Sequence, residues 1–416
     1  MAVRPGFKQT EVGVIPEDWE TPTVLGVSLQ IIDFRGRTPR KLGMSWGGGD
    51  IPALSAGNVR MGFIDFSEEC YLGSEALYRR WMTRGDVEKD DIVFTTEAPL
   101  GNVALIPDDR KYILSQRTVL LKIDPRQAVS RFVFQLMLSE QFQKVLADNS
   151  SGTTAKGIQR KSFELLKVVC PSLPEQHAIA TALSDVDALL GALEQLIAKK
   201  RDLKQAAMQQ LLTSQTRLPG FDGEWDLRRL GDIARIQRGA SPRPIDSPVW
   251  FDESSDIGWV RISDVTKSGM YLRETTQRLS QLGAKHSRPV ARGSLIMSIC
   301  ATVGRPIVTE IDVCIHDGFV VFDDLQADKL FIYYMLKWIE PDWSKHGQTG
   351  SQMNLNTGLI AGTEIALPSL PEQAAIAAVL SDMDAELVAL EQRLAKTRAL
   401  KQGMMQELLT GRTRLV

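Results

Sequence analysis

Residues 171–218 read PSLPEQHAIATALSDVDALLGALEQLIAKKRDLKQAAMQQLLTSQTRL, and residues 368–415 read PSLPEQAAIAAVLSDMDAELVALEQRLAKTRALKQGMMQELLTGRTRL. The two stretches align without a gap, and 33 of their 48 positions are identical. The identities include sparse residues such as Pro174, Gln176 and Asp185 as well as Leu and Ala, so biased composition does not explain the match. Self-similarity at a fixed spacing indicates a duplicated structural unit.

Each copy is predicted to form a long helix. Apolar residues recur at alternating steps of four and three, which is the seam of a coiled coil. Each copy opens with the Ser-x-x-Glu pattern of a capping box and a proline in the first turn. Ser184 and Ser381, each followed by Asp-x-Asp, could divide each copy into a short and a long helix. The predicted seam consists of Ile179, Leu183, Val186, Leu190, Leu193 and Ile197 in the first copy and of Ile376, Leu380, Met383, Leu387, Leu390 and Leu394 in the second.

One amphipathic rod cannot bury its own apolar stripe, and the other copy is the obvious partner. A twofold relation between the copies makes the pair antiparallel. Two alternatives stay open, because each rod could instead pack on the body that precedes it, and helices of another protein could cover part of the stripe.

A body of about 150 residues precedes each helical copy, and the two bodies share a skeleton of motifs in the same order. Arg35-Gly36-Arg37-Thr38-Pro39-Arg40 corresponds to Arg238-Gly239-Ala240-Ser241-Pro242-Arg243, and Pro99-Leu100-Gly101 to Thr302-Val303-Gly304. Runs typical of strands lie at 91–96, 118–123, 294–298 and 319–322, and helix-like stretches lie at 131–147 and 327–340. The predicted fold class is therefore α+β. Two mixed α/β domains are related by a pseudo-twofold axis and separated by two long helices that form an antiparallel coiled coil.

The two ends of the chain complement each other. The first copy continues into Arg217-Leu218-Pro219-Gly220-Phe221, whereas the second stops at Arg414-Leu415-Val416. The missing piece stands at the start, as Arg4-Pro5-Gly6-Phe7. The sequence reads like a two-part ring that is cut once, which predicts termini that lie near each other.

Composition narrows the functional class. The 416 residues carry 49 Lys and Arg against 51 Asp and Glu, so any contact with nucleic acid must come from local basic patches. No apolar run reaches the roughly 20 residues of a membrane helix, and the first residues contain no apolar signal core. Four scattered cysteines do not form a disulfide framework, which fits a reduced cytoplasm.

No motif for catalysis or for a phosphate loop is recognised. The one close Cys/His pair is Cys314-x-His316, which lacks matching ligands for a metal site. For His316, packing or contact with DNA is the preferred interpretation. His177 stands where the other copy has Ala374, which indicates a residue on the helix surface.

Basic and amide side chains gather in the predicted loops of both bodies. Arginine suits phosphates and the edge of guanine, and Gln and Asn suit adenine. The alternative is a solvated surface with nearby carboxylates, which the pairing of the two Arg-Gly-x-x-Pro-Arg loops makes less attractive. The candidate DNA-binding residues are Arg35, Arg37, Arg40, Lys41, Gln116, Lys156, Arg160, Arg238, Arg243, Lys285, Arg288, Gln348 and Asn354.

With these features together, the whole chain resembles the specificity subunits of type I restriction–modification systems. The resemblance rests on the duplicated Leu-Pro-Glu-Gln starts at 173–176 and 370–373, on the Leu-Leu-Thr ends at 211–213 and 408–410, and on the opening Thr10–Trp19. It implies target-recognition domains at 1–170 and 219–367, a central conserved helical spacer at 171–218 and a C-terminal one at 368–416.

The resemblance also implies a function. Each recognition domain reads one half of a bipartite, non-palindromic double-stranded DNA target, and the helices set the spacing. They also dock two methyltransferase subunits and the restriction subunits of the complex. The specificity subunit itself is expected to be non-catalytic and cytoplasmic. It holds no cofactor, since S-adenosylmethionine, ATP and Mg²⁺ belong to its partners.

Two other functions stay open at this point. A free-standing DNA enzyme with an unrecognised site would show turnover by the purified chain alone. A protein-binding scaffold would fail to shift duplex DNA with or without methyltransferase subunits.

Overall fold

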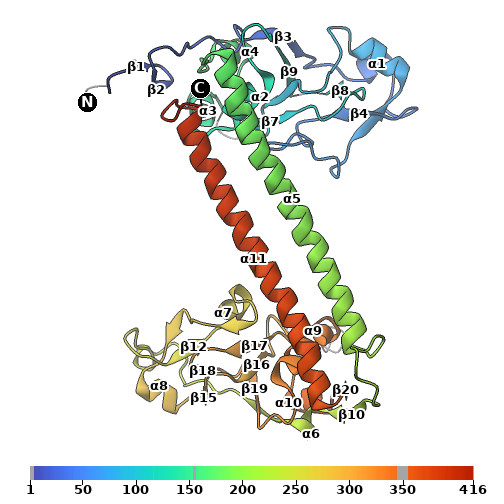
Figure 1. Ribbon diagram of the computed structural model, residues 1–416, viewed down its shortest axis with the longest axis vertical. Helices are drawn as coiled ribbons and strands as arrows, with labels where there is room; N and C mark the ends of the chain where they lie inside the picture. Colours follow the sequence, from blue (N-terminus) through green and yellow to red (C-terminus); the bar gives the residue numbers. More distant parts are fainter. Residues whose placement is uncertain (1–3, 116, 153–155, 344–354, 416) are drawn as a thin grey trace. The chain divides into compact units, whose positions relative to one another are not determined.

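The computed structural model describes residues 4–115, 117–152, 156–343 and 355–415. They form two compact units, of which the first combines two separate parts of the chain and the second is one continuous part. The first unit joins Met1–Glu194 to Gln392–Val416, and the second unit is Gln195–Glu391. We call the part of the first unit that precedes residue 171 the first body, and residues 219–367 the second body. The two long helices of Figure 1 are α5 (Leu173–Leu212) and α11 (Leu370–Leu408).

The first body contains two sheets. Four antiparallel strands lie in the order β3-β9-β6-β7, and three further strands lie in the order β5-β4-β8. In the smaller sheet β4 pairs with β8 in parallel and with β5 in antiparallel fashion. The strands are β1 (Phe7–Thr10), β2 (Gly13–Pro16), β3 (Ser28–Asp33), β4 (Ile51–Leu54), β5 (Tyr71–Gly73), β6 (Ile92–Thr96), β7 (Leu100–Leu105), β8 (Ile113–Leu114) and β9 (Thr118–Ile123).

The second body repeats this order and adds one strand to each sheet. Its larger sheet runs β11-β19-β16-β17-β13 and its smaller sheet runs β14-β12-β18-β15. The parallel pair β12 and β18 corresponds to β4 and β8. The strands are β10 (Asp226–Arg229), β11 (Arg235–Arg238), β12 (Gly258–Val260), β13 (Tyr271–Leu272), β14 (Gln277–Arg278), β15 (Arg288–Val290), β16 (Leu295–Ser298), β17 (Pro306–Thr309), β18 (Val313–Ile315), β19 (Phe319–Asp323) and β20 (Glu364–Leu367).

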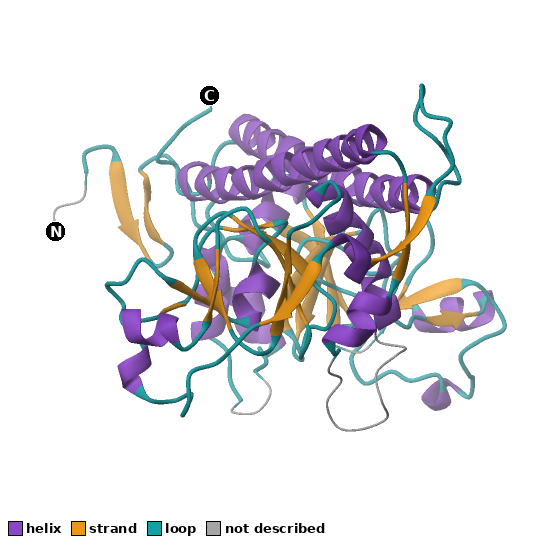
Figure 2. Ribbon diagram, turned by 90° about the horizontal axis from the view of Figure 1, so that it is seen from below, coloured by secondary structure: helices purple, strands orange, loops and turns teal. Residues whose placement is uncertain are grey.

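Short helices and long loops connect these strands in both bodies (Figure 2). The helices of the first body are η1 (Arg40–Leu42), α1 (Glu75–Trp81), α2 (Ser130–Leu138), α3 (Glu140–Asp148) and α4 (Arg160–Leu165). Those of the second are α6 (Leu230–Ile233), η2 (Pro248–Trp250), α7 (Ile262–Lys267), α8 (Gln281–Lys285), α9 (Lys329–Trp343) and α10 (Thr357–Gly362).

The predicted helix-like stretch at 131–147 is two helices. Ser139 stands between α2 and α3 with extended backbone angles, and its Oγ accepts the N–H of Phe142 at 3.2 Å. A serine in this position supplies one of the acceptors that the first turn of a helix lacks, and so it starts a new helix. The stretch predicted at 327–340 corresponds to the single helix α9.

The helical copies contain no break. Both α5 and α11 continue through Ser184 and Ser381, which lie in helical turns that are half-buried. The mixed fold class predicted from the sequence, with two α/β bodies and two long helices, is thus confirmed by the order of the elements.

The first turns of each helix pack on the preceding body and on the end of the other helix. Ile179 and Leu183 are buried in one cluster with Trp19, Phe132 and Leu408 of the first unit. In the second unit Ile376 and Leu380 are buried with side chains that include Phe331 and Leu211. Two of the packing arrangements left open by the sequence therefore occur together at each end.

Further along the helices the predicted seam positions are also covered to different degrees. Leu193, Ile197 and Leu387 are buried. The remaining predicted positions are half-buried, and these are Val186, Leu190, Met383, Leu390 and Leu394.

Ion pairs repeat between the helices in each unit. In the first unit Lys401 pairs with Asp187 at 2.6 Å, and Arg398 with Glu194 at 2.6 Å. The second unit has the corresponding pairs Lys204–Asp384 and Arg201–Glu391. In each unit the positions rise along one helix as they fall along the other, so the paired segments are antiparallel.

The Glu of each Leu-Pro-Glu-Gln start binds an arginine from the end of the other helical copy. Arg414 donates two hydrogen bonds to Glu175, one of 2.8 Å to Oε2, and Trp19 Nε1 donates to the same oxygen at 3.2 Å. Arg217 binds Glu372 through two hydrogen bonds of 2.6 Å. Both glutamates are buried, so each arginine compensates a carboxylate that would otherwise be costly to remove from water. The capping-box pattern does not predict this partner.

The glutamine of each Leu-Pro-Glu-Gln start also makes corresponding hydrogen bonds in both copies. Gln176 Oε1 accepts the N–H of Val129 at 2.8 Å, where α2 starts, and Gln373 Oε1 accepts that of Asp328 at 2.8 Å, where α9 starts. Each Nε2 donates to a proline carbonyl, Pro171 or Pro368. The Glu-Gln dipeptide therefore joins each long helix to its body.

The two ends of the chain meet in the first unit. Arg414 also binds the carboxylate of Asp18, at 3.1 and 2.8 Å. This contact lowers the pKa of the Asp18 carboxyl. It agrees with the closed arrangement that the sequence predicts. Among the described residues, no helix is long and apolar enough to cross a membrane.

Candidate nucleic-acid interface

A cleft opens in each body where four strands end. In the first body, cleft 1 is lined by residues that follow β3, β4, β6 and β8 and has a volume of about 350 Å³. In the second body, cleft 2 is lined at the ends of the corresponding strands β11, β12, β16 and β18 and has a volume of about 740 Å³. The lining of cleft 1 is Arg37, Thr38, Pro39, Trp46, Ser55, Ala56, Gly57, Tyr71, Trp81, Ala98, Ser115 and Arg117. That of cleft 2 is Arg238, Ile245, Arg261, Ile262, Ser263, Cys300, Ala301, His316, Asp317 and Gly318.

Corresponding buried side chains hold the floor of the two clefts. Asn58 Oδ1 accepts the N–H of Ser55 at 3.1 Å, and Asp264 Oδ2 accepts that of Arg261 at 2.9 Å. Both side chains are buried and reach back over three residues. A local side-chain acceptor of this kind fixes a loop without a regular ladder of hydrogen bonds.

Backbone strain recurs at the same place in both clefts. Ala98 has φ +43° and Ala301 has φ +57°, and Arg117 in cleft 1 has φ +69°. Non-glycine residues rarely adopt positive φ, and such residues concentrate at functional sites. The strain supports a functional assignment of the two clefts.

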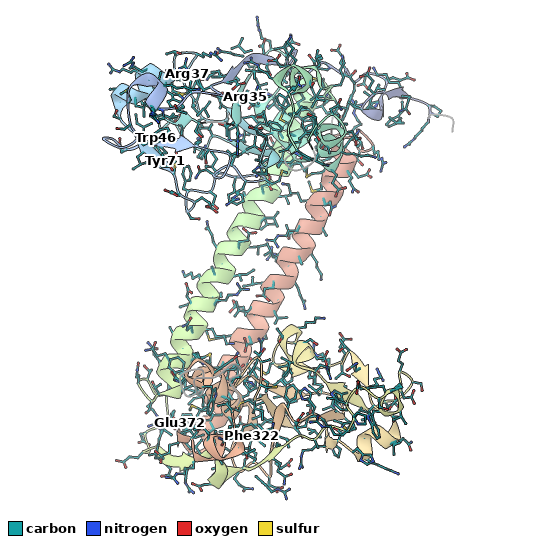
Figure 3. The ribbon with its side chains drawn as sticks, turned by 180° about the vertical axis from the view of Figure 1, so that it is seen from behind. Arg35, Arg37, Trp46, Tyr71, Phe322 and Glu372 are labelled. Carbon is teal, nitrogen blue, oxygen red and sulfur yellow. The ribbon has the colours of Figure 1, made fainter. Side chains whose placement is uncertain are left out.

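The loops with Arg-Gly-x-x-Pro-Arg border the clefts but use their first arginines internally. Arg35 Nε donates to the buried Asp33 at 2.8 Å. Arg37 donates to the carbonyl of Trp81 and to Thr83 Oγ1, and its guanidinium lies 4.9 Å from the centre of the Phe34 ring. Both side chains shape the loop, which Figure 3 shows in the first body, and Arg37 brings its positive charge to the lining of cleft 1.

The second loop is held in a similar way by Asp317. Its carboxylate accepts from Ser241 Oγ at 2.6 Å and from Arg243 at 3.2 Å, and its carbonyl accepts from Arg238 Nε at 2.6 Å. The hydrogen bond from Ser241 is the main reason why the pKa of Asp317 is lowered. Gly239 lies so close to the His316 carbonyl that a Cβ would stand 2.1 Å from it, and therefore only glycine fits.

The other candidate DNA-binding residues fall into three groups, which are residues bound within the protein, exposed residues and residues outside the described ranges. Lys41 donates to the Gly36 carbonyl, Arg160 pairs with Glu164, and Arg288 donates to Gln237 and to the Arg238 carbonyl. Arg40, Lys156 and Lys285 are exposed. Gln116, Gln348 and Asn354 lie outside the described residues.

His316 and Cys314 have separate surroundings. Cys314 is buried beside Trp259 and Leu279, and burial raises its pKa to about 11. His316 lines cleft 2, and its Nδ1 accepts the N–H of Gly318 at 2.9 Å. Burial lowers the pKa of His316, so the imidazole is neutral at pH 7 and carries its proton on Nε2. Among the described residues, no three His, Cys, Asp or Glu side chains gather as a metal site would require.

The sequence reasoning missed most of the side chains that line the clefts. Among them are Trp46, Tyr71 and Arg117 in cleft 1 and Arg261 in cleft 2, none of which belongs to the shared motifs described above. A usable signal was present, because the motifs shared by the bodies border two of the four strand ends, those of β3 and β6 in the first body and of β11 and β16 in the second.

Comparison with known proteins accounts for this architecture. Residues 16–201 and 222–398 each match the family model described as the type I restriction modification DNA specificity domain. The chain belongs to this family. It carries two specificity domains, one for each body and the helix that follows it.

Individual relatives extend over the full chain. The type I restriction enzyme MjaVIII specificity subunit of Methanocaldococcus jannaschii is 25% identical over 430 residues, which cover 98% of this chain and 96% of the relative. A crystal structure of a type I restriction–modification S subunit from M. genitalium has the same fold, with a TM-score of 0.61, 15% identity and 98% of each chain covered. A chain from a study of complex assembly and conformational transition in a type I system gives 0.57 at 21% identity, covering 95% of this chain and 99% of its own.

Proposed function

We propose that this specificity-family chain reads a bipartite double-stranded DNA target, with cleft 1 and its basic loop on one half-site and cleft 2 with its loop on the other. The observation that carries this proposal is the repetition of a cleft at the same four strand ends, with a different lining in each body. A protein that reads two different half-sites needs a constant framework with variable contact residues. The two clefts lie at the same strand ends and differ in the residues that line them.

The charges near the clefts suit a division between positioning and reading. Phosphate contacts fix the register of a protein on DNA, whereas contacts to base edges select the sequence. Exposed Arg40, Lys156 and Lys285 are suited to phosphates. The cleft residues are suited to base edges, and since the clefts differ, the half-sites differ and the target is non-palindromic.

The helices are proposed to set the distance between the half-sites. A continuous helix of 40 residues such as α5 is about 60 Å long at 1.5 Å per residue. This length lies between one and two turns of DNA, since one turn is about 34 Å. Exposed Leu189, Leu203, Val388 and Leu400 leave apolar surface on the helices, which supports docking of two methyltransferase subunits and of restriction subunits.

In this proposal the chain has no catalytic step of its own and acts in the cytoplasm. S-adenosylmethionine, ATP and Mg²⁺ would be bound by partner subunits. The residues of the clefts bind and orient the DNA, and the partners act on it.

The test is methylome sequencing of a strain with and without the gene for this chain. We expect one two-part methylated motif to disappear when the gene is deleted and to return when it is restored. As a biochemical control, duplexes that contain the motif should shift in a gel with this chain and methyltransferase subunits, and duplexes with either half scrambled should not. No change of the methylome in a strain that has the partner subunits would contradict the proposal, as would turnover of DNA by the purified chain alone.

A further inference from the structure

Three aromatic rings form one wall of cleft 1. Trp81 is buried, and its Nε1 donates to the carbonyl of Leu114 at 2.8 Å, which fixes the ring. Trp46 lies with its ring centre 5.4 Å from that of Trp81. On Trp46 stacks Tyr71, with ring centres 5.5 Å apart and an angle of 9° between the planes. The wall is therefore a connected stack that begins in the core and ends at the surface.

The outer end of the stack is open to a ligand. Tyr71 is 55% exposed, and Trp46 is half-buried, so the two rings present apolar carbon toward solvent. Figure 3 shows Trp46 and Tyr71 next to each other in the first body. Large exposed aromatic surface on a folded domain indicates a binding site.

The charged groups beside this wall already have partners. Arg37 is bound to the Trp81 carbonyl and to Thr83, and Arg117 pairs with Glu97 at 3.2 Å. These contacts hold both guanidinium groups in place in the lining of cleft 1. The aromatic surface is the apolar part of this lining, and it is suited to an apolar group on a base.

Cleft 2 offers different chemistry. The lining residues that the structure describes there include Arg261, the neutral His316 and the ionised Asp317, and they include no Trp, Tyr or Phe. These side chains suit hydrogen bonds to base edges. The aromatic wall is thus a property of the first body.

We propose, building on the DNA-reading function above, that Trp46 and Tyr71 are specificity-determining residues of the first body and select thymine by contact with its 5-methyl group. The 5-methyl group of thymine is the apolar group that the four bases present in the major groove. An extruded base would stack on Tyr71, the open end of the wall, because Trp46 is already engaged by two aromatic neighbours. Such stacking tolerates any base, so it would not select thymine. A methyl group needs only the exposed carbon surface.

The experiment removes only the methyl group. Duplexes carrying the motif found by methylome sequencing are prepared with one thymine at a time replaced by deoxyuridine, in either half-site. Their affinities for the full chain assembled with methyltransferase subunits are compared by competition gel shift. We expect at least one thymine in one half-site at which deoxyuridine binds about fourfold more weakly, the effect of one buried methyl group.

The variants Tyr71→Ala and Trp46→Ala should bring the affinity ratio of thymine to deoxyuridine at that position close to one. Tyr71→Phe keeps the ring and should keep the ratio. Ratios at thymines of the other half-site should be the same for the original chain and all variants. Because Tyr71 is exposed, its truncation should leave the melting temperature nearly unchanged, which separates a loss of contact from a loss of fold.

Two results would overturn the inference. One is a motif whose thymines all bind as well in the deoxyuridine form, and the other is a ratio that Tyr71→Ala leaves unchanged. Both can occur while the motif itself is bound specifically, so they are distinct from failure of the proposed function, in which no two-part motif is bound at all.

Discussion

The ends of the two long helices and the two clefts are both duplicated, but duplication has preserved different things in them. At the helix ends the same residue types meet at corresponding positions, Arg414 with Glu175 and Arg217 with Glu372. At the clefts the strand ends correspond, whereas Trp46 and Tyr71 have no counterpart among the lining residues of cleft 2. The framework keeps its side chains, and the clefts keep only their place in the fold.

The reason for the difference lies in what each region must satisfy. A buried carboxylate such as Glu175 or Glu372 is stable only with a charged, hydrogen-bonded partner, so a change on one side of the pair is costly. A residue at the open wall of a cleft is half-exposed and can be exchanged with little loss of stability. Specificity can therefore vary while the framework stays constant.

The largest effect is expected from cavities in the framework. Leu183→Ala and the corresponding Leu380→Ala remove fully buried side chains, and each should lower the free energy of unfolding by about 2–5 kcal/mol. Urea unfolding followed by circular dichroism measures this loss. The two variants should resemble each other, because the two ends of the framework resemble each other.

The matched control for these cavities is Val388→Ala, on an exposed position of α11. It should change the free energy of unfolding by less than about 0.5 kcal/mol. Equal destabilisation by Val388→Ala and Leu380→Ala would contradict the assignment of buried and exposed helix faces.

A smaller loss is expected when a framework ion pair is broken. Arg414→Ala leaves the buried Glu175 without its main partner, whereas Arg414→Ala with Glu175→Gln also removes the charge. The double variant should therefore be more stable than the sum of the single effects predicts, with a coupling of about 0.5–3 kcal/mol in a double-mutant cycle. Additive effects would show that the two side chains act independently.

At the clefts, the arginine loop should separate binding from stability. Arg40→Ala removes an exposed charge and is expected to weaken DNA binding for all sequences, with the salt dependence of the affinity reduced by about one ion. Arg35→Ala instead leaves the buried Asp33 without its ion-pair partner and should therefore lower the melting temperature. Gel shifts at several salt concentrations and thermal melts distinguish the two. The opposite pattern would exclude the phosphate role of Arg40.

The smallest effect concerns pH. Burial lowers the pKa of His316. The positive charge of Arg261 also lowers it, whereas the carboxylate of Asp317 raises it, and the net shift is downward. The folded state thus binds fewer protons at this site than the unfolded state, and its stability should fall as the pH drops through and below the ordinary histidine pKa of about 6.5. His316→Asn should reduce this dependence between pH 7 and pH 5 in urea unfolding.

Much of the framework could be predicted from the sequence, because it repeats. The alternation of apolar residues fixed both helices, and β9 and β19 fall where runs of β-branched and aromatic residues indicated strands. What periodicity does not contain is the long-range partner of a charged residue. The Ser-x-x-Glu pattern pointed to a local cap, whereas Glu175 binds an arginine 239 positions away.

The clefts were predicted only in part for the same reason. Arg37 was identified from its loop, but Trp46, Tyr71 and Trp81 come together through the pairing of β4 with β5 and the packing of α1, which no local pattern records. Several arginines proposed for DNA turned out to be bound within the protein, as the alternative of nearby carboxylates had allowed.

The joining of Arg414 to Asp18 and Glu175 has a consequence for synthesis of the chain on the ribosome. The second unit is continuous and can fold once residue 391 has emerged, but the first unit needs residues 392–416 to be complete. The domain that is made first is thus finished last. Until then Trp19, Ile179 and Leu183 lack the cover of Leu408, so nascent chains expose apolar surface that must be protected from aggregation.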